Sequence, residues 1–162
     1  MGALGNPMYG QSRYDLQASK KVDKLIVTDG ATDLSLAVTD SGATILIEGG
    51  TNGAAACSLP SIINEDMVEF TFLLKAANGT GTYDIDAKDG TEFFIGSIDS
   101  LEGTSDVGID FNGSSHDQLV LAASKGAAGD QVHIKSAGGL WYVSGTTNDQ
   151  DGWAVGTASA NT

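Results

Sequence analysis

The clearest structural signal in the sequence lies at residues 127–145, which read AAGDQVHIKSAGGLWYVSG. Val132 and Ile134 alternate there with polar residues, and this period of two places apolar side chains on one face of a strand. The pair Gly138–Gly139 follows, and paired glycines supply the positive φ angles of a tight hairpin turn. The chain then returns through Trp141. The stretch therefore predicts a β-hairpin whose second strand carries a large aromatic anchor.

The same alternation recurs along most of the chain. Short runs bounded by Gly, Asp and Asn occur at residues 24–28, 33–39, 43–48, 54–59, 68–74, 82–87, 92–98 and 117–122. The run at 68–74 has four large apolar residues on one face and predicts a central strand. The run at 92–98 is apolar on both sides, so we expect both of its faces to be buried. Residues 99–115 are acidic and rich in glycine, which predicts a long surface loop.

Strands at turn spacings of 8–12 residues predict an all-β fold. We expect an antiparallel β-sandwich or a small β-barrel, jelly-roll-like, with an extended N-terminal arm at residues 1–21. The β-rich body then spans residues 22–145. Residues 146–162 form a polar C-terminal tail, in which Trp153–Val155 predicts an added edge strand.

Charge is distributed unevenly along the 162 residues, whose formal net charge is -13. Residues 1–24 hold four basic against two acidic side chains, and the remainder holds four basic against 19 acidic ones, giving +2 and -15. We expect no nucleic-acid partner, because phosphate binding needs a basic face. We expect no membrane partner either, since no run approaches the roughly 20 apolar residues of a span and no signal-peptide core is visible. The asymmetry suggests that the arm and the body bind different partners.

Candidate catalytic residues are few. The single cysteine, Cys57, follows three alanines and is predicted to be a small buried hydrophobe. His116 adjoins Asp117 and Ser114–Ser115, but neighbours along a strand point to opposite faces, so no triad is indicated. His133 lies on the polar face of its strand and is expected to be solvated. We therefore expect no catalytic residues and no enzymatic function.

Two acidic stretches have a partial likeness to calcium loops. Asp84, Asp86 and Asp89–Gly90 match the beginning of such a spacing, but Lys88 occupies a position that needs an acid or amide. The stretch at 148–152 is read in the same way, as a turn rich in Asn and Asp. We expect outward carboxylates at both places, with no metal and no cofactor.

Three aromatic residues raise an alternative function. Trp141, Tyr142 and Trp153 are the residue types of a sugar-stacking platform, although Tyr142 points away from Trp141 on their strand. A carbohydrate-binding or adhesion module therefore remains an alternative. The sequence favours a core or interface position for Trp141.

The order of the strand-forming segments adds a resemblance. The segments are Met67–Phe72 (MVEFTF), Thr82–Ile85 (TYDI), Gly96–Ile98 (GSI), Asp117–Leu121 (DQLVL), Ala128–Ile134 (AGDQVHI) and Gly139–Gly145 (GLWYVSG). Over roughly residues 43–145 their pattern resembles small β-rich virion proteins of tailed bacteriophages, which include capsid decoration (cement) proteins and fibre modules. The chain lacks an obvious repeat or coiled-coil stalk, which favours the decoration protein over the fibre module.

The resemblance implies a non-enzymatic structural protein on the outer surface of a phage capsid, with the major capsid protein as partner. We expect the N-terminal arm to lie across the shell and stabilise it. The arm residues expected to contact the capsid are Tyr9, Arg13, Tyr14 and Lys20.

The same resemblance implies a homotrimer. The run Phe93–Ile95 is apolar on both sides, which suggests that the copies join through sheet edges there. Phe93, Phe94 and Trp141 are the expected anchors, either of this subunit interface or of the core.

Overall fold

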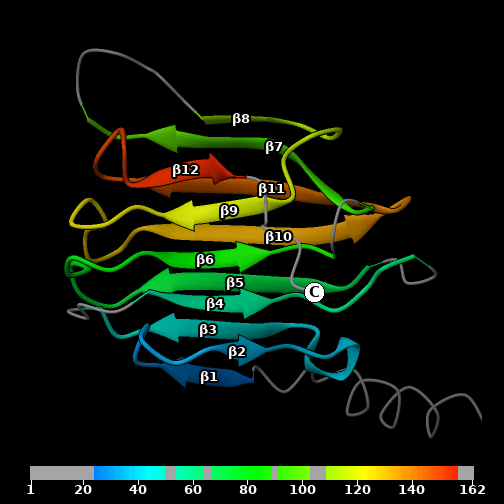
Figure 1. Ribbon diagram of the computed structural model, residues 1–162, viewed down its shortest axis with the longest axis horizontal. Coiled ribbons are helices and arrows are strands. Elements are labelled where there is room, and N and C mark those ends of the chain that lie inside the picture. The colour runs from blue at the N-terminus through cyan, green and yellow to red at the C-terminus, as the bar shows by residue number, and fades with distance from the viewer. Residues whose placement is uncertain (1–23, 50–53, 64–66, 89–90, 103–108, 157–162) are drawn as a thin grey trace, which may run out of the picture.

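The structure is a computed structural model that describes residues 24–49, 54–63, 67–88, 91–102 and 109–156. It confirms an all-β sandwich of two sheets whose strands run along a common direction (Figure 1). The first sheet has the order β1 (Leu25–Thr28), β3 (Ala43–Ile47), β5 (Glu69–Leu74), β10 (Gln131–Ala137), β11 (Leu140–Thr147), β7 (Phe93–Ser100) and β8 (Ile109–Asn112). The second has the order β12 (Trp153–Gly156), β9 (Gln118–Leu121), β6 (Tyr83–Asp86), β4 (Ala55–Ser58) and β2 (Leu34–Ser35).

The sheets are mixed, and the expectation of purely antiparallel pairing is wrong. From β1 to β7 the chain alternates between the two sheets, so that β1, β3 and β5 pair in parallel, as do β2, β4 and β6. The turns rich in Gly and Asp carry the chain from one sheet to the other. Each strand from β1 to β6 therefore meets a sheet neighbour that is two strands away in sequence and runs in the same direction.

The hairpin predicted at residues 127–145 is confirmed. Strands β10 and β11 pair antiparallel, with Ser136 opposite Trp141 and Ala137 opposite Leu140. Gly138 and Gly139 form the turn with φ of 57° and 78°. Two positive φ angles in a row are the signature of a type I′ turn, which matches the twist of the flanking strands.

The core lies between the sheets, and β5 is an interior strand as predicted, between β3 and β10. Its residues Phe70, Phe72 and Leu74 are all buried. Phe70 packs against Trp141 of β11, with ring centroids 6.2 Å apart. The largest fully buried side chains are Trp141, Trp153, Phe70, Phe72 and Phe94. Their burial gives the body a rigid aromatic centre.

The strand predicted at residues 33–39 is largely absent. Only the two residues of β2 pair with β4, and a 3-10 turn, η1 (Val38–Asp40), follows. The Asp40 carboxylate accepts a hydrogen bond from the Ala37 N–H at 2.9 Å and pairs with Lys24. This local acceptor stabilises a turn where the apolar alternation predicted a strand.

Strand β7 has one buried face, so the expectation of burial on both faces is wrong. Phe94 and Ile98 face the core, whereas Phe93 and Ile95 are only half-buried on the outer face. The surface loop predicted at 99–115 is also wrong in part, because β7 continues to Ser100 and β8 adds a strand. The end of β7 and the whole of β8 are polar enough in sequence to resemble a loop.

Candidate functional site

The four arm residues expected to contact a capsid, Tyr9, Arg13, Tyr14 and Lys20, lie outside the described residues. Of the three expected anchors, Phe94 and Trp141 have no exposed surface, and Phe93 is half-buried. The first two therefore stabilise the core of a single copy.

The location expected for the trimer contact is wrong. Strand β7 lies between β11 and β8 inside the seven-stranded sheet, so the run 93–95 has no free edge to offer a second copy. At this side of the sandwich, the edge strands β8 and β12 also lie in contact with each other. The opposite side, at β1 and β2, is where the sheets have their other edges (Figure 1).

Strand β1 has one paired side and one open side. The Lys24 carbonyl accepts a hydrogen bond from the Thr44 N–H at 2.7 Å, and the Thr28 carbonyl accepts one from the Glu48 N–H at 2.9 Å. Backbone groups alternate in direction along a strand, so the N–H and C=O groups of Leu25 and Val27 point away from β3. Strand β1 therefore presents its backbone at the edge of the sheet.

The side chains at this edge are apolar and exposed. Leu25 is 60% exposed and Val27 is 53% exposed. On the same face, Val27 is in register with Leu46 of β3, which is in register with Leu73 of β5. We name Leu25, Val27, Leu46 and Leu73 the edge patch. An edge strand with exposed apolar side chains is a surface suited to pairing with another chain.

The edge patch could not be found from the alternation of residues 24–28 alone. Leu25 and Val27 form one apolar row, but Ile26 lies on the other face, so the pattern does not determine which face is inward. The structure turns Ile26 and Thr28 toward the core. The sequence signal that could have indicated the edge patch is a strand that is apolar on both faces and adjoins a charged segment.

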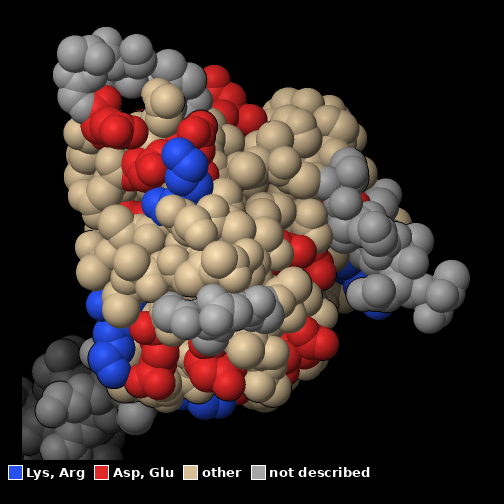
Figure 2. Space-filling model, turned by 60° about the vertical axis from the view of Figure 1, so that its left-hand side comes forward, with Lys and Arg blue, Asp and Glu red and all other residues tan. Residues whose placement is uncertain are grey.

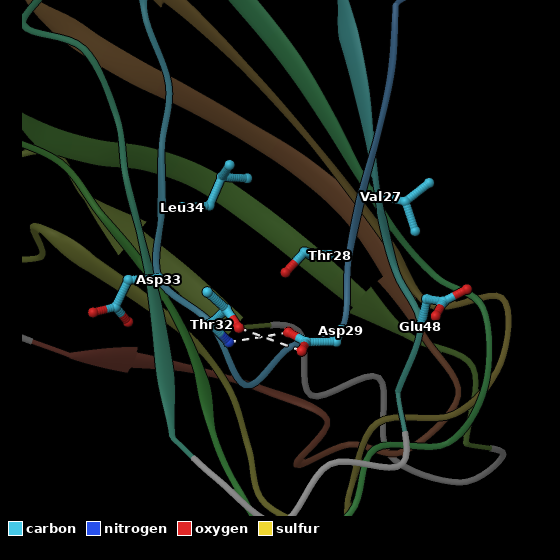
Figure 3. A pocket seen from close by; sticks show the side chains of 7 residues that line it. All are labelled: Val27, Thr28, Asp29, Thr32, Asp33, Leu34 and Glu48. Carbon is cyan, nitrogen blue, oxygen red and sulfur yellow. Dashed lines mark hydrogen bonds between the residues drawn. The ribbon is translucent and has the colours of Figure 1, made fainter.

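A hollow of about 400 Å³ opens between β1 and β2 (Figure 3). Its lining is Val27, Thr28, Asp29, Thr32, Asp33, Leu34 and Glu48. Asp29 shapes one wall, because its Oδ1 accepts hydrogen bonds from the N–H groups of Ala31 at 2.9 Å and Thr32 at 3.0 Å. These backbone hydrogen bonds, Ala31 first, lower the pKa of the Asp29 carboxyl, so it is ionised at neutral pH.

Three carboxylates surround the hollow. Asp33 Oδ1 accepts a hydrogen bond from the Ala56 N–H at 2.9 Å, and Glu48 Oε1 lies 2.8 Å from Lys75 Nζ. With Asp29, these groups give the hollow a negative rim. Chemically, such a rim with apolar Val27 and Leu34 suits a cationic side chain that has an aliphatic stem.

A second, shallow trough of about 350 Å³ lies on the outer face of the seven-stranded sheet, across β5, β10 and β11. His133 is opposite Ser144 in the ladder, and its Nε2 is 3.8 Å from Glu69 Oε2. This set has the residue types of a Ser-His-Glu triad. All three strands are interior, however, so their backbone N–H groups serve the sheet ladders and not an oxyanion site.

Cys57 is fully buried, as predicted, and is no nucleophile at neutral pH. Burial raises the pKa of its thiol to about 12. The neighbouring Tyr83 is also buried, and burial raises the pKa of its phenol too. Both groups stay protonated in the folded chain and behave as core residues.

The residues around His116 have structural roles. The His116 ring packs edge-on against Phe111, with centroids 6.2 Å apart. The N–H groups of Ser114 and Ser115 donate to Asn112 Oδ1 at 2.9 Å and 3.1 Å, which forms a tight turn. Within the described ranges, the buried His116 Nδ1 has no hydrogen-bond partner.

The acidic pair Asp84 and Asp86 lies on the outer face of the five-stranded sheet. The Gln118 side-chain amide donates to Asp86 at 2.9 Å and to Asp84 at 3.5 Å. Burial, and then the charge of Asp86, raise the pKa of Asp84. Asp89 lies outside the described residues, and within those described no three His, Cys, Asp or Glu side chains are grouped to hold a metal ion.

The sugar platform considered from sequence does not assemble. Trp141 and Trp153 are buried in the core, at 0% and 1% exposure, and cannot offer a ring face to a ligand. Tyr142 alone of the three is exposed. Of these three described residues, Tyr142 is therefore the one whose ring could stack on a sugar in the alternative function.

One structural feature that sequence reasoning missed is Asp130, which has no exposed surface. Its carboxylate accepts hydrogen bonds from the N–H groups of Ala127 and Asn148, each at 2.8 Å, and from the Asn148 side-chain amide at 2.8 Å. The Thr147 hydroxyl donates to it at 3.2 Å. Asp130 therefore joins the two ends of the hairpin and acts as a structural group.

The chain carries 21 acidic against eight basic side chains, and clusters of Asp and Glu are visible on the face that Figure 2 shows. Over the described residues, no helix combines the length and apolar composition needed to cross a membrane.

Comparison with known proteins yields no match to a protein-family model, a curated protein or a solved structure.

Proposed function

We propose that this chain is a non-enzymatic structural protein that binds the outer surface of a phage capsid and stabilises the shell. The observation that carries the proposal is the edge patch. It combines an open strand edge with exposed Leu25 and Val27, directly after a segment of opposite charge to the body. This combination favours a protein that assembles with other proteins over one that binds a small molecule in a deep cavity.

The body supports the same proposal. Two packed sheets with a buried aromatic centre make a rigid unit, and a charge of -15 beyond residue 24 keeps such units soluble when they are crowded. The cationic N-terminal segment, residues 1–23, is proposed to contact the major capsid protein through Tyr9, Arg13, Tyr14 and Lys20. A homotrimer on the shell is part of the proposal.

The test is co-sedimentation of the purified chain with undecorated capsids of the phage that encodes it. We expect saturable binding by the full chain and little binding after deletion of residues 2–20. The matched control carries the substitution Tyr142→Ala, which removes the exposed aromatic residue and should leave binding unchanged. Undiminished binding by the deletion variant would remove the N-terminal segment from the contact, and no binding by the full chain would refute the proposal.

A further inference from the structure

The open edge of β1 is an unpartnered surface in the described part of the chain. Its backbone groups at Leu25 and Val27 point away from β3, and these two side chains are 60% and 53% exposed. Edge strands are commonly covered, shortened or charged, because a bare apolar edge pairs with other strands. The edge of β1 is therefore open to pairing with another strand.

We propose that residues 13–19 of a neighbouring copy of this chain add to β1 as an antiparallel strand. Those residues read RYDLQAS, in which Tyr14, Leu16 and Ala18 alternate with polar residues. Period-two alternation is the pattern of a strand with one apolar face. The same spacing fits a helix poorly, because its apolar residues would spread around the helix.

The lengths and the apolar residues of the two partners fit. An antiparallel register that places Ala18 opposite Leu25 also places Leu16 opposite Val27, so apolar residues cover the exposed side chains of β1. In this register Arg13 reaches Gly30, beside the hollow whose rim holds Asp29 (Figure 3). Arg13 thus lies beside the acidic rim at the end of the new strand, while Asp15, opposite Thr28 on the same face, offsets part of that attraction.

The occupant belongs to a second copy because the chain has no suitable turn for pairing with itself. A hairpin onto its own β1 in this register would turn through residues 20–23, which read KKVD, without Gly, Asn or Pro. The hairpin at Gly138–Gly139 shows what this chain uses for a tight turn. A strand donated by a neighbour requires no turn and, if exchanged in a ring, produces a closed oligomer.

This inference goes beyond the proposed function. It concerns how copies of the chain join, and it holds whether or not they sit on a capsid. A strand at 13–19 assigns Arg13 and Tyr14 to the contact between copies instead of the capsid contact, and it leaves Tyr9 and Lys20 on either side for contact with a shell.

The first test is sedimentation of the full chain at micromolar concentration. We expect a dimer or trimer of the 16.5 kDa chain. Substitutions Val27→Lys, on the edge, and Leu16→Lys, in the donated segment and outside the described body, should each return the monomer. Control substitutions Leu101→Lys, at a residue 64% exposed, and Gln11→Lys should keep the oligomer. A monomeric full chain, or edge variants that stay oligomeric, would overturn the proposal.

The second test distinguishes a strand donated by a neighbouring copy from a strand that folds back onto its own β1. Ala18→Cys and Leu25→Cys are combined and oxidised with copper phenanthroline. The native thiol at Cys57 is buried, so it stays out of the reaction. A ladder of covalent dimers or trimers on a non-reducing gel is expected, while the control pair Ala18→Cys with Tyr142→Cys should give none. A cross-linked monomer would show that the segment pairs with its own β1, and no cross-link would refute the register; either result overturns the proposal.

Discussion

Substitution of Trp141 by phenylalanine separates a core role from an interface role. Trp141 is fully buried against Phe70, and its Nε1–H has no hydrogen-bond acceptor among the described residues. Replacing the indole by a phenyl ring removes roughly 50 Å² of buried apolar surface, worth about 1 kcal/mol. The substitution also removes the unsatisfied indole N–H from the core, and this gain offsets about 1 kcal/mol or more of that loss.

We therefore expect Trp141→Phe to change the free energy of unfolding by less than about 1 kcal/mol, whereas Trp141→Ala should cost about 3–5 kcal/mol. Urea denaturation followed by far-ultraviolet circular dichroism measures both. Trp153→Phe is the matched comparison, because that indole is equally buried and also lacks an acceptor. If Trp141→Phe were as damaging as Trp141→Ala, and the loss varied with protein concentration, the indole would be bonded across a subunit interface and the reasoning would be wrong.

Three further predictions concern the described body. Asp130→Ala leaves buried N–H groups without an acceptor and should cost about 3 kcal/mol or more in urea denaturation, whereas the exposed Asp151→Ala should change little. Gly96→Ala would place a Cβ 2.0 Å from a carbonyl oxygen of β11, at a residue whose φ is +130°. This substitution should abolish folding or lower the melting temperature sharply. The control Gly138→Ala, where the Cβ would enter open space, should cost only about 1 kcal/mol. The raised pKa of Cys57 predicts that stability is fully present below the thiol's ordinary pKa of 9.0 and is lost as the pH rises toward about 12, because the unfolded chain releases the thiol proton first. Cys57→Ala should weaken that alkaline loss in melts between pH 8 and 11, and an unchanged pH dependence would count against it.

Sequence predicts the local elements of this protein better than their arrangement. Alternation located the strand at 69–74 and the hairpin at 138–139, because both depend on neighbouring residues alone. Turn residues show that the chain reverses, but they do not say whether the next strand joins the same sheet. The parallel pairs β1–β3–β5 therefore had no sequence signal that our reasoning could use.

The same limit applies to the candidate surface. Leu25 and Val27 were recognised as one row of a strand, but only the pairing of β1 with β3 shows that this row faces outward at an edge. The tryptophans illustrate the converse, since their residue type suggested a ligand platform and their burial assigns them to the core. Burial depends on contacts between distant segments, which periodicity does not encode.

The most direct measurement of the proposed function is the heat stability of the shell. Under the proposed function the chain is encoded by a tailed phage, and undecorated capsids of that phage are loaded with it to saturation. The temperature at which the shell opens is followed by dye access to the packaged DNA. The account predicts a higher opening temperature than for bare capsids, with bound copies saturating at a fixed ratio to the major capsid protein. Capsids that bind no protein, or that open at the same temperature when loaded, would contradict it.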